Sequence, residues 1–289
     1  MTKRIILRTL AVLVITAVVL TALSVFVCAV YVKTTYYSVT LDGISAPVRA
    51  VLLTDLHDKS YGENNSRLIS KIRSQSPDVI FMAGDMIDSE ADETDTENLL
   101  QLIETLCGIA PVYFSLGNHE QSYIKTDDTF LEKVENAGAA VVNDSYVDVT
   151  IAGQPLRIGG TMGHGFYFGR TEEEFTSSDE YVFLKEFENT DTPTICLAHM
   201  PDTFIFNGAY NLWNVDLVLS GHTHGGLVRL PFVGGLYAPM QGWFPEYDRG
   251  YFRLGEHMQM IISAGLSGHG ILPRINNLPE IVVIDLVGE

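Results

Sequence analysis

Residues 215–226 read VDLVLSGHTHGG, an apolar run followed directly by a cluster of glycine and histidine. A short, continuous apolar run that ends in Gly or polar residues is typical of a strand buried on both faces. We therefore predict a strand over residues 215–220. Four further runs have the same form and are predicted as strands, at residues 48–53, 79–83, 112–116 and 194–198.

Each of these five runs ends at polar residues with useful chemistry. In chain order the runs are followed by TDLH (54–57), GDMID (84–88), GNHE (117–120), His199 and GHTHGG (221–226). The carboxyl ends of strands in an α/β sheet form the ligand crevice, so these segments are expected to converge. In Asp-x-His and His-x-His, an extended backbone would point both side chains to one side.

The side chains at these five strand ends predict a metal site. Oxygen and imidazole ligands without thiolate suit Mn, Fe, Zn or Co. Seven candidates are too many for one ion, but they fill two adjacent coordination shells if one carboxylate bridges, and paired metals typify phosphoester hydrolysis. The seven predicted ligands are Asp55, His57, Asp85, Asn118, His199, His222 and His224.

The ordered set DLH, GDMID, GNHE, LAH and GHTHGG resembles the calcineurin-like metallophosphoesterase superfamily over about residues 48–286. Within it, the chain is most similar to the bacterial YkuE-type branch and to the transmembrane proteins with a metallophosphoesterase domain. That branch lies near enzymes that cleave UDP-2,3-diacylglucosamine. The resemblance implies a four-layer α-β-β-α sandwich and a metal-dependent phosphoric ester hydrolase with two divalent metal ions.

The resemblance also implies a role for each matching residue. Asp85 would bridge the two metals, and a hydroxide held between them would attack phosphorus in line. His119 would act catalytically beside the leaving group, oriented by Asp88, for which a helix cap is the alternative. Asp55, His57 and His224 would bind one metal, and Asn118, His199 and His222 the other.

The remaining sequence supports one layered α/β domain. Leu99, Leu102, Ile103 and Leu106 follow a helical stripe, and the acidic run at 88–97 suits the approach to that helix. Residues 251–254, 258–263 and 281–286 are strand-like and suggest a second sheet in the last third. We expect sheets packed face to face with helices outside.

The N-terminal segment predicts a membrane anchor. No charge lies between Arg8 and Lys33, and residues 10–32 are long enough to span a bilayer, whereas the apolar core of a cleavable signal peptide is shorter. Three positive side chains precede the helix, so the positive-inside rule exports the chain beyond residue 33. The expected organisation is an anchor at 1–33, a linker at 34–47 and a metallophosphoesterase domain at 48–289, outside the cytoplasm.

Charge bears on the class of partner. The chain has 18 basic and 36 acidic residues, and the four basic residues before position 34 leave 14 basic against 36 acidic in the rest, a net charge of −22. Nucleic-acid binding is therefore not expected, since it needs clustered Lys and Arg.

The substrate is expected to be a small, lipid-linked or cell-wall-linked phosphodiester or pyrophosphate. The alternatives are a noncatalytic metal-binding scaffold and a UDP-2,3-diacylglucosamine-type pyrophosphatase at the cytoplasmic face. Arg229 and Arg274 are candidate anion contacts. The apolar stretch 227–243 is expected to pack as an ordinary loop rather than to contact lipid. His164, His257 and His269 are expected to be structural.

Overall fold

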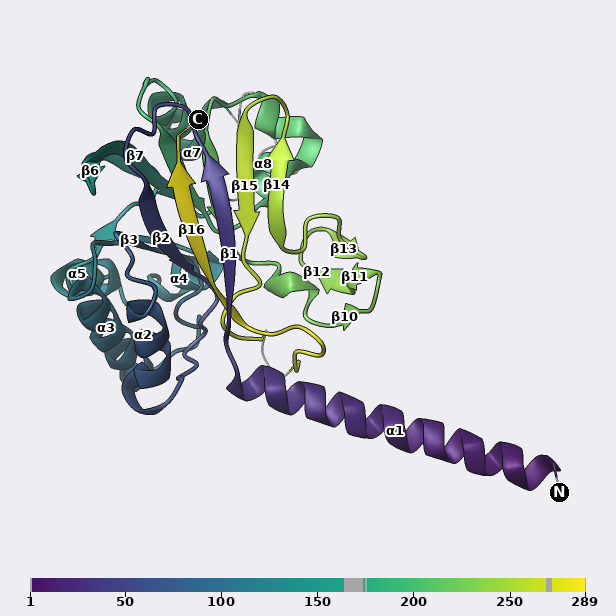
Figure 1. Ribbon diagram of the computed structural model, residues 1–289. Helices are drawn as coiled ribbons and strands as arrows, with labels where there is room; N and C mark the ends of the chain where they lie inside the picture. Colours follow the sequence, from purple (N-terminus) through teal and green to yellow (C-terminus); the bar gives the residue numbers. More distant parts are fainter. Residues whose placement is uncertain (1, 164–173, 175, 269–271, 289) are drawn as a thin grey trace.

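The computed structural model describes residues 2–163, 174, 176–268 and 272–288. Two six-stranded mixed sheets face each other, and helices cover their outer faces (Figure 1). The four-layer α/β sandwich is therefore confirmed. An apolar core fills the space between the two sheets and includes Phe81, Leu197 and Ile284.

The first sheet carries the predicted N-terminal strands. β2, β3, β4 and β5 run parallel, and β16 lies antiparallel to β2. Its outer face packs against α2 (Ser66–Arg73), α3 (Glu93–Cys107) and α5 (Phe130–Asn136). The strand order is β1 (Lys33–Thr40), β16 (Glu280–Val287), β2 (Val48–Leu53), β3 (Val79–Ala83), β4 (Val112–Ser115) and β5 (Ala140–Val141).

The second sheet has parallel central strands and antiparallel edges. Its outer face packs against α7 (Asp179–Phe187), α8 (Asp202–Ile205) and the 3-10 helix η2 (Phe206–Asn211). The strand order is β14 (Gly250–Leu254), β15 (Met258–Ile262), β9 (Leu217–Ser220), β8 (Thr194–Ala198), β7 (Gln154–Thr161) and β6 (Ser145–Ile151).

Two expectations about this layout need correction. The last third does not form the second sheet alone, because β16 returns to the first sheet and the earlier strands β8 and β9 belong to the second. The stretch 34–47 is not simply a linker, since Lys33–Thr40 forms β1 and pairs in parallel with β16. Its sequence, KTTYYSVT, is mostly polar and aromatic and therefore lacks the continuous apolar run by which the other strands were predicted.

The acidic run at 88–97 covers the N-terminal end of α3, as expected. The Asp92 side chain accepts hydrogen bonds from the backbone N–H groups of Thr94 and Asp95, and Asp95 completes a capping box. Asp92, not Asp88, is therefore the capping residue. The first turn also places carboxylates at the positive end of the helix dipole.

The N-terminal helix α1 (Thr2–Val30) projects from the domain (Figure 1). An 18-residue window within Lys3–Val30 has a mean hydropathy of 2.8, so the length and composition of α1 allow it to cross a membrane. A signal sequence near the N-terminus can meet the same criteria.

Candidate metal centre

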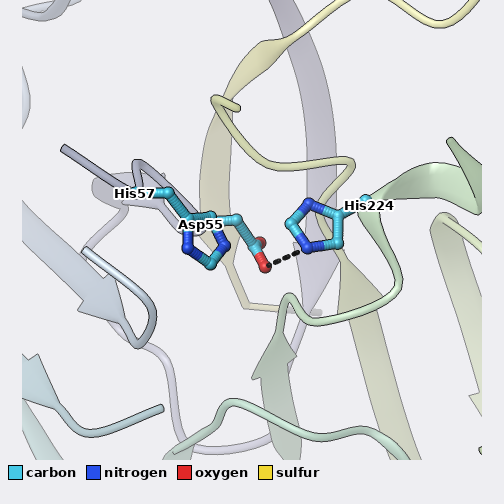
Figure 2. A group of neighbouring side chains, drawn as sticks. All are labelled: Asp55, His57 and His224. Atoms are coloured by element: carbon cyan, nitrogen blue, oxygen red, sulfur yellow. Dashed lines mark ion pairs between the residues drawn. The ribbon is translucent and has the colours of Figure 1, made fainter. Parts of the chain in front are cut away.

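Asp55, His57 and His224 form the first group of candidate ligands. Asp55 and His57 follow β2, whereas His224 begins the 3-10 helix η3 (His224–Gly226) after β9. One ligand atom from each lies within 4.8 Å of the others. Asp55 and His224 face each other, with His224 Nε2 3.7 Å from Asp55 Oδ1 (Figure 2). The two sheets thus contribute to one site.

Asp85, His199 and His222 form a second group with the same spacing. His199 Nε2 lies 3.0 Å from Asp85 Oδ2, and the other ring nitrogen, Nδ1, lies 2.9 Å from the carbonyl oxygen of Ala83. This carbonyl fixes the orientation of the ring, as an outer partner of a metal-binding histidine usually does. All three side chains are buried.

Asp85 lies between the two groups. Its Oδ2 atom is 3.0 Å from His199 Nε2 in the second group and 3.8 Å from His57 Nε2 in the first. Asn118, the first residue of α4 (Asn118–Tyr123), also has a buried side-chain oxygen. The structure therefore gathers six of the seven predicted ligands in these two groups, and Asn118 immediately precedes His119, whose backbone N–H donates to Asp85.

The backbone brings these side chains together in a way that the sequence reasoning did not anticipate. Asp55, His57, His222 and His224 have φ angles of 52°, 45°, 67° and 49°, in the left-handed region rather than the extended one. The expectation that an extended i, i+2 pair aims both ligands is therefore wrong. Left-handed non-glycine residues are strained and cluster at functional sites, where the surrounding structure holds them.

Backbone N–H groups fix both aspartates. The N–H of His222 donates to Asp55 Oδ1, and the N–H of His119 donates to Asp85 Oδ1, each at 2.9 Å. Close backbone approach makes this possible, because a Cβ atom on Gly221 would lie 2.4 Å from Asp55 Oδ2. Each carboxylate is thereby held with one oxygen on the backbone.

Three buried ligand atoms test whether the residues fit metal ions. Asp55 Oδ2, Asn118 Oδ1 and His222 Nε2 have no hydrogen-bond partner among the residues that the structure describes. A buried polar atom without a partner is destabilising, and two cations, one in each ligand group, would satisfy these three atoms. The donor set, oxygen and imidazole without thiolate, suits Mn, Fe, Zn or Co. The residues therefore fit a metal site.

The protonation states agree with this fit. Burial lowers the pKa of His57 to about 4 and that of His222 to about 3, so both rings are neutral at pH 7, as ligation requires. Burial opposes ionisation of Asp85, but the nearby His199, His57 and His119 lower its pKa overall. Although burial opposes it, the same Asp85 charge raises the pKa of His199 to about 10. A cation between Asp85 and His199 would replace that proton.

His119 and Asp88 lie beside the seven ligands. His119 Nδ1 is 2.7 Å from Asp88 Oδ1, and His119 Nε2 is 4.0 Å from Asp85 Oδ2. The His119 ring also packs edge-on against His57, with centroids 4.6 Å apart. The Asp88 carboxylate further accepts the N–H of Ser89 at 2.8 Å. The pair thus lies next to His57 and Asp85 of the two ligand groups.

Glu120 is a site residue that the sequence reasoning missed. Its fully buried carboxylate accepts backbone N–H groups of Asp85 and Gly117 at 2.8 Å and of Met86 at 2.6 Å. It therefore ties the loop after β3 to the loop after β4. Its burial and the Asp85 charge raise its pKa. The available signal was an acidic residue directly after Gly-Asn-His.

Arg274 and Asn277 were also not expected in a supporting role. Asn277 donates to the carbonyl oxygen of His224 at 2.7 Å, and buried Arg274 donates to that of Ser267 at 2.7 Å. The Ser267 carbonyl lies 3.2 Å from His224 Nδ1. Arg229 instead pairs with Asp248 at 2.7 Å. Protein acceptors thus engage both arginines that were candidate anion contacts.

Among the described residues, one further histidine, His257, lies away from the site. His257 Nε2 is 3.1 Å from the carbonyl oxygen of Trp213, next to the second sheet. His164 and His269 lie outside the described residues.

Comparison with known proteins agrees with this site. The family model for calcineurin-like phosphoesterase matches residues 48–226, a span that contains all seven candidate ligands, His119 and Asp88. The chain belongs to the calcineurin-like phosphoesterase family. The resemblance that the motifs indicated is therefore confirmed.

Curated relatives extend over most of the chain. An uncharacterized metallophosphoesterase of Campylobacter jejuni is 29% identical, over 87% of this chain and 62% of the relative. Phosphodiesterase YaeI of Escherichia coli is 27% identical, over 84% and 83% of the two chains. The uncharacterized metallophosphoesterase YkuE of Bacillus subtilis is 26% identical, over 82% and 78%. The present chain thus spans less than two thirds of the length of the Campylobacter relative.

Proposed function

We propose that the protein is a membrane-anchored phosphoesterase with two divalent metal ions, which hydrolyses a phosphodiester or pyrophosphate bond. The observation that carries this proposal is the shared carboxylate of Asp85, whose Oδ2 lies 3.0 Å from one ligand group and 3.8 Å from the other. Such sharing is the arrangement that paired metals require.

In this proposal, each group holds one ion. Asn118 completes the second group, since its buried Oδ1 faces no described hydrogen-bond donor. When bound, two divalent cations lower the pKa of water at the site and neutralise the phosphoryl oxygens. The first ion would be held by Asp55, His57 and His224 and the second by Asn118, His199 and His222, with Asp85 within reach of both groups.

His119 and Asp88 handle the proton of the leaving group. Asp88 accepts the Nδ1–H of His119, so Nε2 is the ring nitrogen that faces the site. When the ring is protonated, Nε2–H donates to the oxygen that leaves phosphorus, and the ring becomes neutral. Burial opposes the ionised form of Asp88, but the neighbouring His119 and His57 rings and the hydrogen bond from Ser89 lower its pKa overall, which keeps it ionised as a partner.

The membrane anchor and its direction belong to the same proposal. α1 has the hydropathy of a spanning helix, and Lys3, Arg4 and Arg8 lie at its N-terminal end. The positive-inside rule then places the catalytic domain outside the cytoplasm. The substrate would be a phosphoester that reaches that side of the membrane, either small or linked to lipid or cell wall.

The test is hydrolysis by the full chain, purified in detergent, of bis-p-nitrophenyl phosphate and p-nitrophenyl phosphate. Turnover should disappear with chelator, return with added Mn, and be lost in Asp85→Asn. Asp128→Asn makes the same charge change at an exposed position outside the site and should keep full activity. Metal content is measured in every sample, and two ions per chain are expected.

The outcomes separate the alternatives. Bound metal without turnover of either ester would favour a metal-binding scaffold or a narrow substrate requirement over a general esterase. Absence of bound metal under all conditions would overturn the assignment of the seven ligands.

A further inference from the structure

The loops that follow His224 carry exposed apolar side chains on an ordered support. They form two short hairpins, β10 (Arg229–Leu230) with β11 (Gly234–Gly235) and β12 (Tyr237–Ala238) with β13 (Gly242–Trp243). We define the 232–244 patch as Phe232, Val233, Tyr237, Met240, Trp243 and Phe244, all of them exposed.

The exposure of this patch is not that of an ordinary packed loop. Trp243 is 68% exposed, Val233 61% and Phe244 58%, and Phe232 is fully exposed. Asp248 fixes the hairpin of β10 and β11, because its Oδ2 accepts hydrogen bonds from Arg229 at 2.7 Å and from the N–H of Gly235 at 2.6 Å. The expectation of loop packing over 227–243 is therefore wrong for these side chains. A clustered apolar surface of this kind marks an interaction site.

The position of α1 indicates what covers the patch. Residues 3–23 of α1 are all exposed, and contact with the domain begins at Ser24. The uncharged part of this exposed segment, residues 9–23, rises about 22 Å, and the long side chains of Lys3, Arg4 and Arg8 can extend from it to the far interface of the bilayer. If α1 crosses the bilayer, as the proposed function holds, the membrane boundary falls near Ser24.

Asn276 places the patch at that boundary. Its backbone N–H donates to Ser24 Oγ at 2.7 Å, and its side-chain amide donates to the carbonyl oxygen of Arg229 at 3.1 Å. Arg229 is only three residues before Phe232. The hairpins β10 to β13 also project from the domain on the side on which α1 runs away from it (Figure 1).

Composition favours a lipid surface over another protein. Residues 217–245 contain no Asp or Glu, in a chain with 36 acidic residues. Trp and Tyr, both present in the patch, are enriched where a bilayer meets water, because an apolar ring and a polar edge suit that boundary. Anionic headgroups would meet no repelling carboxylate from this stretch.

We propose that the 232–244 patch is a second membrane contact, which inserts into the interface of the bilayer that α1 crosses. The site would then face the bilayer, because the first hairpin starts at Arg229, shortly after the ligand His224. The inference rests on the proposed anchoring by α1, and its test must distinguish the two.

The two tryptophans of the chain provide that test, since Trp213 is 1% exposed in the core and Trp243 lies in the patch. The full chain is placed in nanodiscs of phosphatidylethanolamine and phosphatidylglycerol whose acyl chains carry bromine near the headgroup. Interfacial side chains reach about 5–10 Å into this region, so roughly half of the Trp243 emission should be quenched. Trp243→Phe leaves Trp213 alone and should remove the quenching. A matched control adds Leu212→Trp to Trp243→Phe; Leu212 is exposed after η2, and this probe should stay unquenched.

Each other outcome counts against the proposal in a distinct way. Resistance to alkaline extraction with unquenched Trp243 would overturn the patch and leave the anchor standing. Release of the chain by alkaline extraction would overturn the anchor and, with it, the patch. Shielding of Trp243 that depends on two copies per disc and not on bromine would assign the patch to self-association instead.

Discussion

The Nδ1 atom of His119 lies 2.7 Å from Oδ1 of Asp88, while its Nε2 atom lies 4.0 Å from Oδ2 of Asp85. One edge of the ring is thus held by a carboxylate and the other faces the candidate metal centre. His57, Asp88 and His119 are also close enough to one another to hold a metal ion, but this geometry suits the proton donor of the proposed mechanism. It predicts that the importance of His119 depends on the leaving group.

His119→Ala should reduce kcat by about 10²–10⁴-fold for a diester with a poorly acidic alcohol, the usual range for a general acid. The reduction should be much smaller for bis-p-nitrophenyl phosphate, because p-nitrophenolate leaves without protonation. Steady-state kinetics over a series of leaving groups measures the difference, with metal content as a control. Asp88→Asn should reduce kcat with the same dependence on the leaving group, but by a smaller factor. An equal loss across the series would indicate that His119 has a structural role.

Gly221→Ala should weaken metal binding while the fold is kept. An added Cβ would lie 2.4 Å from Asp55 Oδ2 and 2.8 Å from Thr54 Cβ, so the carboxylate must move. We expect a loss of metal affinity of at least about tenfold, the usual size for a displaced partner of a metal ligand. Metal titration followed by activity measures this loss.

Gly108→Ala is the matched control for this substitution. The nearest contact of its added Cβ is the Thr105 carbonyl oxygen at 3.3 Å, at the end of α3 and away from the ligands. Its metal affinity should equal that of the wild type. A Gly221→Ala variant with unchanged affinity would show that Asp55 is not constrained as the structure indicates.

The sequence predicts the strands that are continuous apolar runs and misses those in which polar residues or glycines interrupt the apolar ones. β2, β3 and β8 have the predicted bounds, because each is a continuous apolar run. β6 and β7 were not predicted: β6 alternates polar and apolar side chains, and β7 includes the glycines at 159 and 160. A Cβ on Gly160 would lie 2.3 Å from the Val142 carbonyl oxygen, a long-range constraint that no local pattern contains.

The candidate site shows the same division. The ordered motifs predict which side chains meet, because strand ends gather at one edge. They do not predict the left-handed backbone at His57 and His224, because that conformation departs from the extended backbone that the i, i+2 spacing suggested. Nor do they predict Glu120, whose role consists of backbone hydrogen bonds to two separate loops.

Glu280→Gln should destabilise the domain at neutral pH and less so in acid. Glu280 is buried, pairs with Lys33 Nζ at 2.8 Å and accepts the N–H of Ala264 at 2.8 Å. Burial opposes its ionisation, but Lys33 and these hydrogen bonds lower its pKa overall. Losing a hydrogen bond to a charged group costs about 1.5–3 kcal/mol, which we expect as the drop in the free energy of unfolding at pH 7.

The sign of the pH dependence is set by the lowered pKa. The contribution of Glu280 is complete above the pKa of the unfolded chain and is lost as the pH falls through the lower pKa of the folded protein. The difference in urea midpoint between wild type and Glu280→Gln should therefore narrow below about pH 4.5. Exposed Glu256→Gln is the control and should change the midpoint little at any pH. A difference that stays constant with pH would mean that the Glu280 charge does not act through Lys33.

The direction of α1 can be tested by labelling one cysteine on each side of it. Glu135 is exposed on α5, so Glu135→Cys places a thiol on the catalytic domain, and Thr2→Cys places one at the other end of α1. With the domain outside the cytoplasm, an impermeant maleimide should label Glu135→Cys in intact cells and label Thr2→Cys only after lysis. The unaltered chain gives the background from Cys107, which is half-buried. The reverse pattern would place the phosphoesterase in the cytoplasm, where a nucleotide-linked lipid pyrophosphate is accessible, and would favour that substrate over an extracytoplasmic one.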